Sequence, residues 1–166
     1  MAGKILDQKI TDALNEQMSH EFYSQHLYLA MAAYFDLMEL KGFGHWMRTQ
    51  AAEEAAHALK IFEFLLDCDA EVKFNGVKTV PAKWKNSVHV FEDVLAHEQK
   101  VTEYINHLYD LAVKEKNHAA TIFLQWFVTE QVEEEATARE LLHKAMIAQE
   151  SKAGLLFLDS ELVKRK

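Results

Sequence analysis

The chain has 166 residues, a formal net charge of -8 and an apolar fraction of 49%, which suits one domain with a buried core of its own. Its one proline and five glycines favour long helices over sheet or disorder. The acidic balance argues against nucleic acid and anionic membrane as partners, because both attract basic patches. A cation is the partner that this charge favours.

The cysteine content and the apolar segments indicate a cytoplasmic protein. Cys68 is the single cysteine and so has no internal disulfide partner. No apolar signal run follows Met1, and no segment reaches the apolar length of a membrane span. We therefore expect a cytoplasmic, all-helical domain.

Helix-breaking residues divide the chain into four long periodic segments and a short fifth one. The breaks lie at Gly42 and Gly44, between Asn75 and Pro81, near Asn117, and at Gly154. The predicted helices run from about Leu6 to Glu39, Phe43 to Cys68, Ser87 to Lys114, Ala119 to Ala148, and 152 to 164. A helix of about 28 residues is roughly 40 Å long. Four rods of similar length predict a four-helix bundle over about 6–148, within a single domain 1–166.

The connections between these segments constrain the topology. The breaks near Gly42 and Asn117 are short, so we expect the helices that they join to be antiparallel neighbours. The segment at about 68–87 is long enough to run the length of a bundle. Such a loop is unusual in a compact domain unless it makes a crossover, and a bundle with one long crossover is a known variant.

Each long segment has an apolar stripe at helical spacing, and a glutamate interrupts each stripe once near its middle. The interrupting residues are Glu21, Glu54, Glu98 and Glu134. An unpaired carboxylate in a core costs several kcal/mol, while a domain is stable by only about 5–15 kcal/mol. These groups must therefore be protonated, paired or bound to metal. No lysine or arginine lies on the stripes, so one or two divalent metal ions are the expected counter-charge.

The spacing of ligand-type residues supports a metal site. Glu54 and His57 form a Glu-x-x-His pair on one helix face, the signature of di-metal carboxylate bundles. Gln131 and Glu134 repeat this spacing with different residue types. An oxygen-rich site with one imidazole favours iron or manganese over thiolate-seeking metals.

Taken one at a time, these residues also have ordinary structural interpretations that involve no metal. A Glu-x-x-His pair occurs by chance in many helices, and the run from Glu130 to Glu135 alone is more typical of a solvated face. Tyr28 and Trp126 alone are more typical of core packing. His97 is expected to face away from Glu98. The histidines off the stripes are expected at the surface: His20, His26, His45, His89, His107, His118 and His143.

Four segments resemble the helical motifs of bacterial non-haem ferritins. They read LNEQMSHEFYSQHLYL, AAEEAAHALKIFEFL, HEQKVTEYIN and FLQWFVTEQVEEEA, and the tail AGLLFLDSEL is similar to the short fifth helix of that family. The resemblance covers nearly the whole chain in the right order. It implies a ferritin-like bundle and a shell of 24 chains. Such a shell oxidises Fe(II) with dioxygen or peroxide and stores a ferric oxide-hydroxide mineral.

The resemblance also implies a ferroxidase centre with two adjacent iron ions. The residues that match the ligands of the first ion are Glu21, Glu54 and His57. Glu54 would bridge to the second ion, whose other matching residues are Glu98, Glu134 and, close by, Gln131. A third iron site beside this pair is matched by Glu53, Glu130 and Glu133, with Glu134 shared between the two sites. Tyr28 matches a tyrosine near the centre, and Trp126 matches a neighbouring aromatic residue.

Two departures separate the chain from the haem-binding bacterioferritins. Where bacterioferritins have their haem-ligating methionine, this chain has Ala55. Where they have a second Glu-x-x-His pair, this chain has Gln131-x-x-Glu134. No haem is therefore expected. The miniature DNA-protecting ferritins differ too, because they bind iron across a subunit interface and lack the fifth helix.

Two alternatives remain. The first is a non-storing di-iron oxidase or peroxidase of the rubrerythrin type, although this chain lacks the cysteine-rich module of rubrerythrins. The second is an acidic structural bundle that binds no metal. The apolar tail argues against both, because a short apolar helix beyond a complete bundle needs another subunit to cover it.

Overall fold

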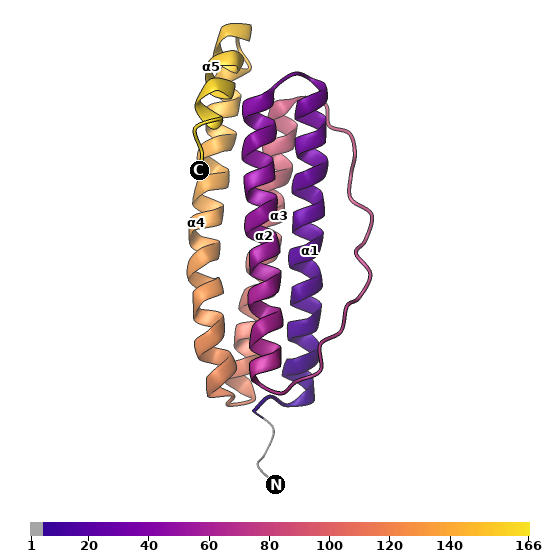
Figure 1. The fold of residues 1–166 in the computed structure, drawn as a ribbon. Helices are drawn as coiled ribbons and strands as arrows, with labels where there is room; N and C mark the ends of the chain where they lie inside the picture. The colour runs from indigo at the N-terminus through magenta and orange to yellow at the C-terminus, as the bar shows by residue number, and fades with distance from the viewer. Residues whose placement is uncertain (1–4) are drawn as a thin grey trace.

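The computed structural model describes residues 5–166 and shows an all-α fold; the first four residues of the predicted domain lie outside this range. The helices are α1 (Gln8–Leu37), α2 (Lys41–Asp67), α3 (Ser87–Lys114), α4 (His118–Ala148) and α5 (Lys152–Leu162). The first four lie side by side as a bundle, and α5 packs at one end (Figure 1). In residues 5–166, no helix has both the length and the apolar character that crossing a membrane requires.

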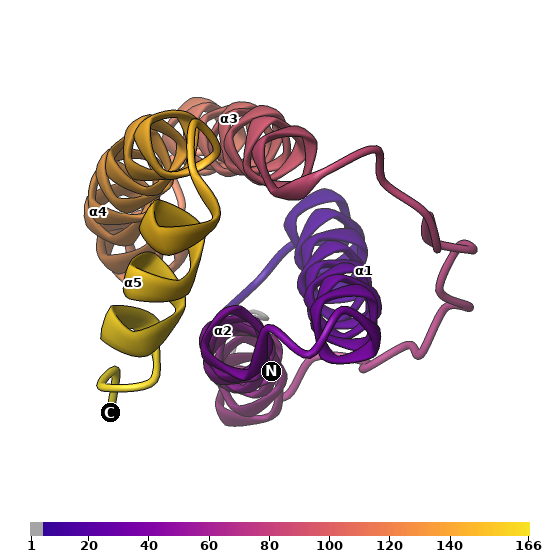
Figure 2. The same ribbon diagram turned by 90° about the horizontal axis from the view of Figure 1, so that it is seen from above.

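The order of the helices gives the predicted topology with one long crossover. α1 and α2 are antiparallel neighbours, and so are α3 and α4. The segment 68–86 runs back along the outside of α1, so α2 and α3 point the same way (Figures 1 and 2). Asn15 fixes this segment to α1. Its Nδ2 donates to the Glu71 carbonyl at 2.8 Å, and its Oδ1 accepts from the Lys73 N–H at 2.6 Å.

Polar side chains define where most of the helices begin. Each accepts a hydrogen bond from the backbone N–H three residues ahead, which satisfies a donor that has no partner inside the helix. The capping residues are Asp7 for α1, Asn86 for α3, Asn117 for α4 and Ser151 for α5. The polar break that the sequence shows near Asn117 is therefore a helix cap.

Gly76 lies in the crossover segment as predicted, but the other glycines that were predicted to break helices lie inside them. Gly42 and Gly44 belong to the start of α2, and the chain instead turns at Glu39, whose φ is 59°. A Cβ atom on Gly42 would lie 1.7 Å from the backbone oxygen of Asp159 in α5. Gly154 likewise lies within α5. At Gly42 the missing side chain permits a close approach between two helices, which a pattern along the sequence does not reveal.

The apolar core forms two clusters with a polar layer between them. One cluster lies toward α5 and is built around Phe35, Phe43 and Phe91. The other lies toward the opposite end of the bundle and is built around Leu14, Ile61 and residues facing them. Between the two lie buried polar side chains from all four long helices: Gln17, Glu21, Gln50, Glu54, His57, Glu98, Gln131 and Glu134.

Candidate metal centre

The four glutamates that interrupt the apolar stripes all point into the bundle. Their exposed fractions are 1% for Glu21, 2% for Glu54, 1% for Glu98 and 8% for Glu134. Each comes from a different long helix, because helical spacing places each one on the same face as its apolar neighbours. His57, one turn after Glu54, is also buried. The polar layer is therefore a cluster of acidic groups around one imidazole.

A first set of possible ligands is formed by Glu21, Glu54 and His57. One ligand atom from each lies within 4.8 Å of the others. His57 Nδ1 is 3.3 Å from Glu54 Oε2 and 3.9 Å from Glu21 Oε2. The buried Glu21 Oε2 has no hydrogen-bond partner among residues 5–166. A cation bound among these atoms would satisfy that oxygen, so the residues present fit a metal ion.

A second set adjoins the first and shares His57 with it. One ligand atom from each of His57, Glu130 and Glu134 lies within 4.8 Å of the others. Trp126 packs edge-on against the His57 ring, with the ring centroids 5.3 Å apart. The half-buried Glu130 thus lies with Glu134, and the resemblance implies both of these residues for the third iron site as well.

Glu98 is held on the other side of the layer by two donors. The Tyr28 hydroxyl donates to Glu98 Oε1, and Gln131 Nε2 lies 3.3 Å from Glu98 Oε2 and 3.2 Å from the Glu98 carbonyl oxygen. Glu98 belongs to neither three-residue set within residues 5–166. Burial is the largest cause of the raised pKa of Glu54 and of Glu134, and the negative charge of Glu98 is the next one, so Glu98 acts within the same electrostatic cluster.

Burial controls the protonation of the cluster. It raises the pKa of Glu21 and of Glu54 well above the ordinary value, and neighbouring carboxylates add to the effect. The pKa of Glu98 is also raised by burial, and that of Glu134 is raised to about 7, mainly by burial and then by Glu98. Without metal, protons on these groups relieve the repulsion. A divalent cation can replace those protons as the counter-charge.

Two glutamines that the sequence reading did not assign to the site support its carboxylates. Gln17 Nε2 donates to Glu21 Oε1 at 2.8 Å. Gln50 Nε2 donates to Glu134 Oε2 at 2.8 Å and to Glu54 Oε1 at 3.3 Å. Each glutamine lies four residues before a core glutamate of its own helix, a spacing that places two side chains on one face. That repeated Gln-x-x-x-Glu spacing could have identified both.

The remaining residues implied for a third site, Glu53 and Glu133, belong to neither set among residues 5–166. Glu53 is half-buried and pairs with Arg165, whose Nη2 lies 2.5 Å from Glu53 Oε2. Glu133 is exposed. Arg165 comes from the chain just beyond α5, so no local pattern in the sequence indicates this contact.

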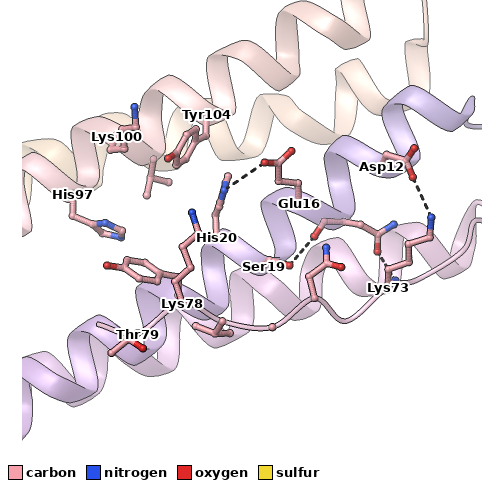
Figure 3. Close-up of a pocket in the computed structure, with 16 residues that line it drawn as sticks. Asp12, Glu16, Ser19, His20, Lys73, Lys78, Thr79, His97, Lys100 and Tyr104 are labelled. Atoms are coloured by element: carbon pink, nitrogen blue, oxygen red, sulfur yellow. Dashed lines mark hydrogen bonds and ion pairs between the residues drawn. The ribbon is translucent and has the colours of Figure 1, made fainter. Parts of the chain in front are cut away.

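Two histidines line a separate cavity of about 700 Å³ between α1, α3 and the crossover segment (Figure 3). His20 is half-buried and stacks on Tyr104, with ring centroids 4.1 Å apart, which differs from the predicted surface position. His97 Nε2 lies 2.8 Å from Ser24 Oγ. Burial, together with the nearby His20, lowers the pKa of His97 to about 4, so this ring is neutral at pH 7.

Comparison with known proteins identifies the family. A sequence model described as a ferritin-like domain matches residues 11–147. The chain is 39% identical to the bacterial non-heme ferritin of Bacteroides fragilis (strain 638R) over 161 residues, covering 97% of this chain and all of the relative. It is 43% identical to that of Staphylococcus saprophyticus over 132 residues, covering 80% and 79%. The chain belongs to the ferritin family.

The solved structures agree with this assignment. An open pore ferritin from the hyperthermophilic archaeon Archaeoglobus fulgidus superimposes with a TM-score of 0.95 at 45% identity, covering 97% of this chain and 99% of that one. The predicted fold class and the predicted resemblance to non-haem ferritins are therefore confirmed. The ferritin-like match spans the helices that carry all the core carboxylates.

Proposed function

We propose that this chain oxidises Fe(II) with dioxygen at the carboxylate centre and stores the ferric oxide-hydroxide product inside a shell made of its own copies. The observation that carries the proposal is the buried set of Glu21, Glu54 and His57, in which a carboxylate oxygen lacks a hydrogen-bond partner among the described residues. Membership of the ferritin family supports the same activity.

The two adjacent sets of ligands give each of two Fe(II) ions a place. Glu21 and His57 hold the first ion, and Glu54 reaches it from the neighbouring turn of α2. Glu134 holds the second ion, with Glu130 and Glu98 beside it. By analogy with the family, Glu54 is the candidate bridge. Gln50 donates to both Glu54 Oε1 and Glu134 Oε2, which places these two carboxylates side by side. Gln131 and Tyr28 fix the orientation of Glu98.

Carboxylate ligands favour the oxidation of iron. Hard anionic oxygens stabilise Fe(III) over Fe(II) and so lower the reduction potential. Two Fe(II) ions can then give one electron each to one dioxygen molecule, which takes up two protons and leaves as hydrogen peroxide. The protons that the buried carboxyls release when they bind metal become available at the same place. The apolar clusters on either side of the layer limit the access of bulk water.

Storage requires assembly and a way out of the centre for iron. We assign the shell of 24 chains by analogy with the family, and exposed apolar residues of α5 such as Leu156 and Phe157 provide surface for it. Glu53, Glu130 and Glu133 form a third, less enclosed position that passes iron between the centre and the mineral.

Iron counting separates storage from the non-storing di-iron oxidase or peroxidase. Excess Fe(II) is added in air to the metal-free protein, which is then sized by chromatography. Storage predicts iron far beyond the two or three ions that the bundle can ligate, eluting with a large assembly. About two ions per chain on a small oligomer would favour the rubrerythrin-like alternative, and no bound iron would contradict the metal centre itself.

Substitution of the ligands tests the position of the centre. Glu54→Ala and His57→Ala should each slow the fast phase of Fe(II) oxidation at least about tenfold, because each removes a ligand of the first ion. Glu63→Ala is the matched control, since Glu63 is an exposed glutamate of the same helix. Stopped-flow absorbance measures the rate. A fast phase that survives in either ligand variant would show that the centre is elsewhere.

A further inference from the structure

The chain beyond α5 folds back onto the side of the metal centre. Arg165 reaches α2, where its Nη1 donates to Gln50 Oε1 at 2.9 Å and its Nη2 to Glu53 Oε2 at 2.5 Å. The guanidinium lies over the Trp46 ring, 4.5 Å from its centroid. One planar cation thus has an amide oxygen, a carboxylate and an aromatic face as partners, which matches the donor geometry of arginine.

Several contacts hold Arg165 in this place. Its carbonyl oxygen lies 2.7 Å from His45 Nε2, which ties the backbone to α2. α5 itself is fixed to the start of α2, where the Phe43 N–H donates to Asp159 Oδ1 at 3.0 Å. Figure 2 shows α5 lying between the ends of α2 and α4, and it contacts both helices. The contact with the centre therefore follows from the docking of α5.

Arg165 also acts on the centre through Gln50. Because the Gln50 oxygen accepts from Arg165, its NH₂ group faces inward, where it donates to Glu134 and Glu54. An amide in the opposite orientation would place its oxygen against two carboxylates. Arg165 therefore sets the orientation of a donor to two of the core carboxylates.

The contact with Glu53 bears on metal occupancy. Glu53 is one of the carboxylates that the proposed function assigns to the third position, yet here it is already neutralised by a cation from the same chain. The Arg165 side chain is 23% exposed and that of Glu53 is 42% exposed. Ion pairs with this much exposure are weak and exchange readily. A divalent cation can therefore displace the arginine, at a cost in affinity.

We propose that Arg165 is the internal counter-ion of the third metal position, paired with Glu53 until a third divalent cation displaces it. This rests on the proposed function. The competition lowers the affinity of the third position relative to the two core positions, whose ligands Arg165 does not occupy. A position that binds iron weakly suits the passage of ions to or from the centre better than a tight one does. Arg165 is thus a positioning residue that keeps the third position exchangeable.

Zinc binding tests the proposal without any redox reaction. Zn²⁺ is titrated into the metal-free assembled protein at pH 7 by calorimetry, and the Kd of the third ion per chain is compared with those of the first two. Arg165→Met should tighten the third Kd about tenfold, while Arg165→Lys, which keeps the charge, should stay within about twofold of the unsubstituted protein. Lys164→Met removes the same charge from a residue paired with Glu161 and should leave the third Kd unchanged.

A double-mutant cycle identifies Glu53 as the partner. In a Glu53→Gln background, adding Arg165→Met should change the third Kd by less than about twofold. Three results would overturn the proposal: an unchanged third Kd in Arg165→Met, the same tightening in Lys164→Met, or the same tightening without Glu53. Glu54→Ala separates this test from the proposed function, because that variant must lose tight binding of the first ion whatever Arg165 does. If it binds Zn²⁺ as before, the centre itself is misplaced.

Discussion

At the scale of single residues, the fold tolerates four buried carboxyl groups because it does not keep them all ionised. Burial raises the pKa of each of them. Donors from Gln17, Gln50, Gln131 and Tyr28 satisfy part of their acceptor capacity. In the metal-free chain, protons relieve the remaining repulsion between the carboxylates. When metal is bound, the cations relieve it. The same arrangement that destabilises the metal-free chain thereby creates affinity for iron.

The raised pKa values predict that the free energy of unfolding of the metal-free chain depends on pH. Glu134→Gln tests this prediction for one of the four groups. The pKa of Glu134 is about 7 in the folded chain, whereas the ordinary value for a glutamate is 4.5. Between pH 4.5 and 7 the Glu134 carboxyl group is ionised in the unfolded chain but keeps its proton in the folded chain. The free energy of unfolding therefore falls as pH rises from about 4.5 through 7, by on the order of 3 kcal/mol for this group. Glutamine stays neutral, so the metal-free variant should gain stability over the unsubstituted protein as pH rises.

Melting temperatures of both metal-free proteins between pH 4.5 and 8 measure this difference. The comparison between variants is needed because His97 acts with the opposite sign. Its pKa is about 4 in the folded chain, whereas the ordinary value for a histidine is 6.5. His97 therefore adds stability as pH rises between those two values. His97 is common to both proteins and cancels in the difference. A difference that stays constant with pH would contradict the raised pKa of Glu134.

At the scale of elements, α5 completes the start of α2. The N-cap residue of α2 is Leu40, whose side chain makes no capping hydrogen bond. Asp159 of α5 instead accepts from the Phe43 N–H, and its carboxylate lies where the helix dipole favours a negative charge. The close approach that this requires is possible because residue 42 is a glycine. The docking of α5 thus depends on one missing side chain.

Gly42→Ala should therefore loosen α5 while leaving the bundle folded. The added Cβ would meet the Asp159 backbone oxygen, so α5 must shift, with an expected loss of about 1–3 kcal/mol. Hydrogen exchange followed by mass spectrometry should show faster exchange in α5 and in the chain that carries Arg165. Gly76→Ala is the control, because a Cβ at Gly76 meets nothing within 4 Å. Unchanged protection of α5 in Gly42→Ala would mean that the contact is not needed.

The sequence predicts what depends on periodic local patterns. The four long helices, the crossover and the inward glutamates follow from spacing alone, since a core face repeats every three or four residues. The role of Gly42 does not follow, because its neighbour Asp159 is distant in the chain. The pairing of Glu53 with Arg165, 112 residues away, is hidden for the same reason. The assignment of Glu133 to a third iron position stays a prediction.

At the scale of the whole molecule, the chain alone leaves apolar surface uncovered. Phe157 of α5 is 69% exposed and its neighbour Leu156 is 62% exposed, while Leu158 and Leu162 of the same helix pack on the bundle. Ile122 and Val132 of α4 are also exposed. Adjacent apolar side chains on a short terminal helix are typical of surfaces that another subunit covers. A closed shell that stores mineral would bury them.

Phe157→Glu should therefore break the proposed shell into smaller oligomers, because a charge buried at a subunit contact is costly unless it is paired. The fold of each chain should survive, since the Phe157 side chain points away from the core. Ala153→Glu adds the same charge at an exposed position of the same helix and should leave the assembly intact. Analytical ultracentrifugation measures the mass of both variants. If Phe157→Glu still forms the full assembly, α5 does not lie at a subunit contact. If it forms small oligomers that oxidise Fe(II) but retain only a few ions per chain, oxidation belongs to the single bundle and storage to the shell.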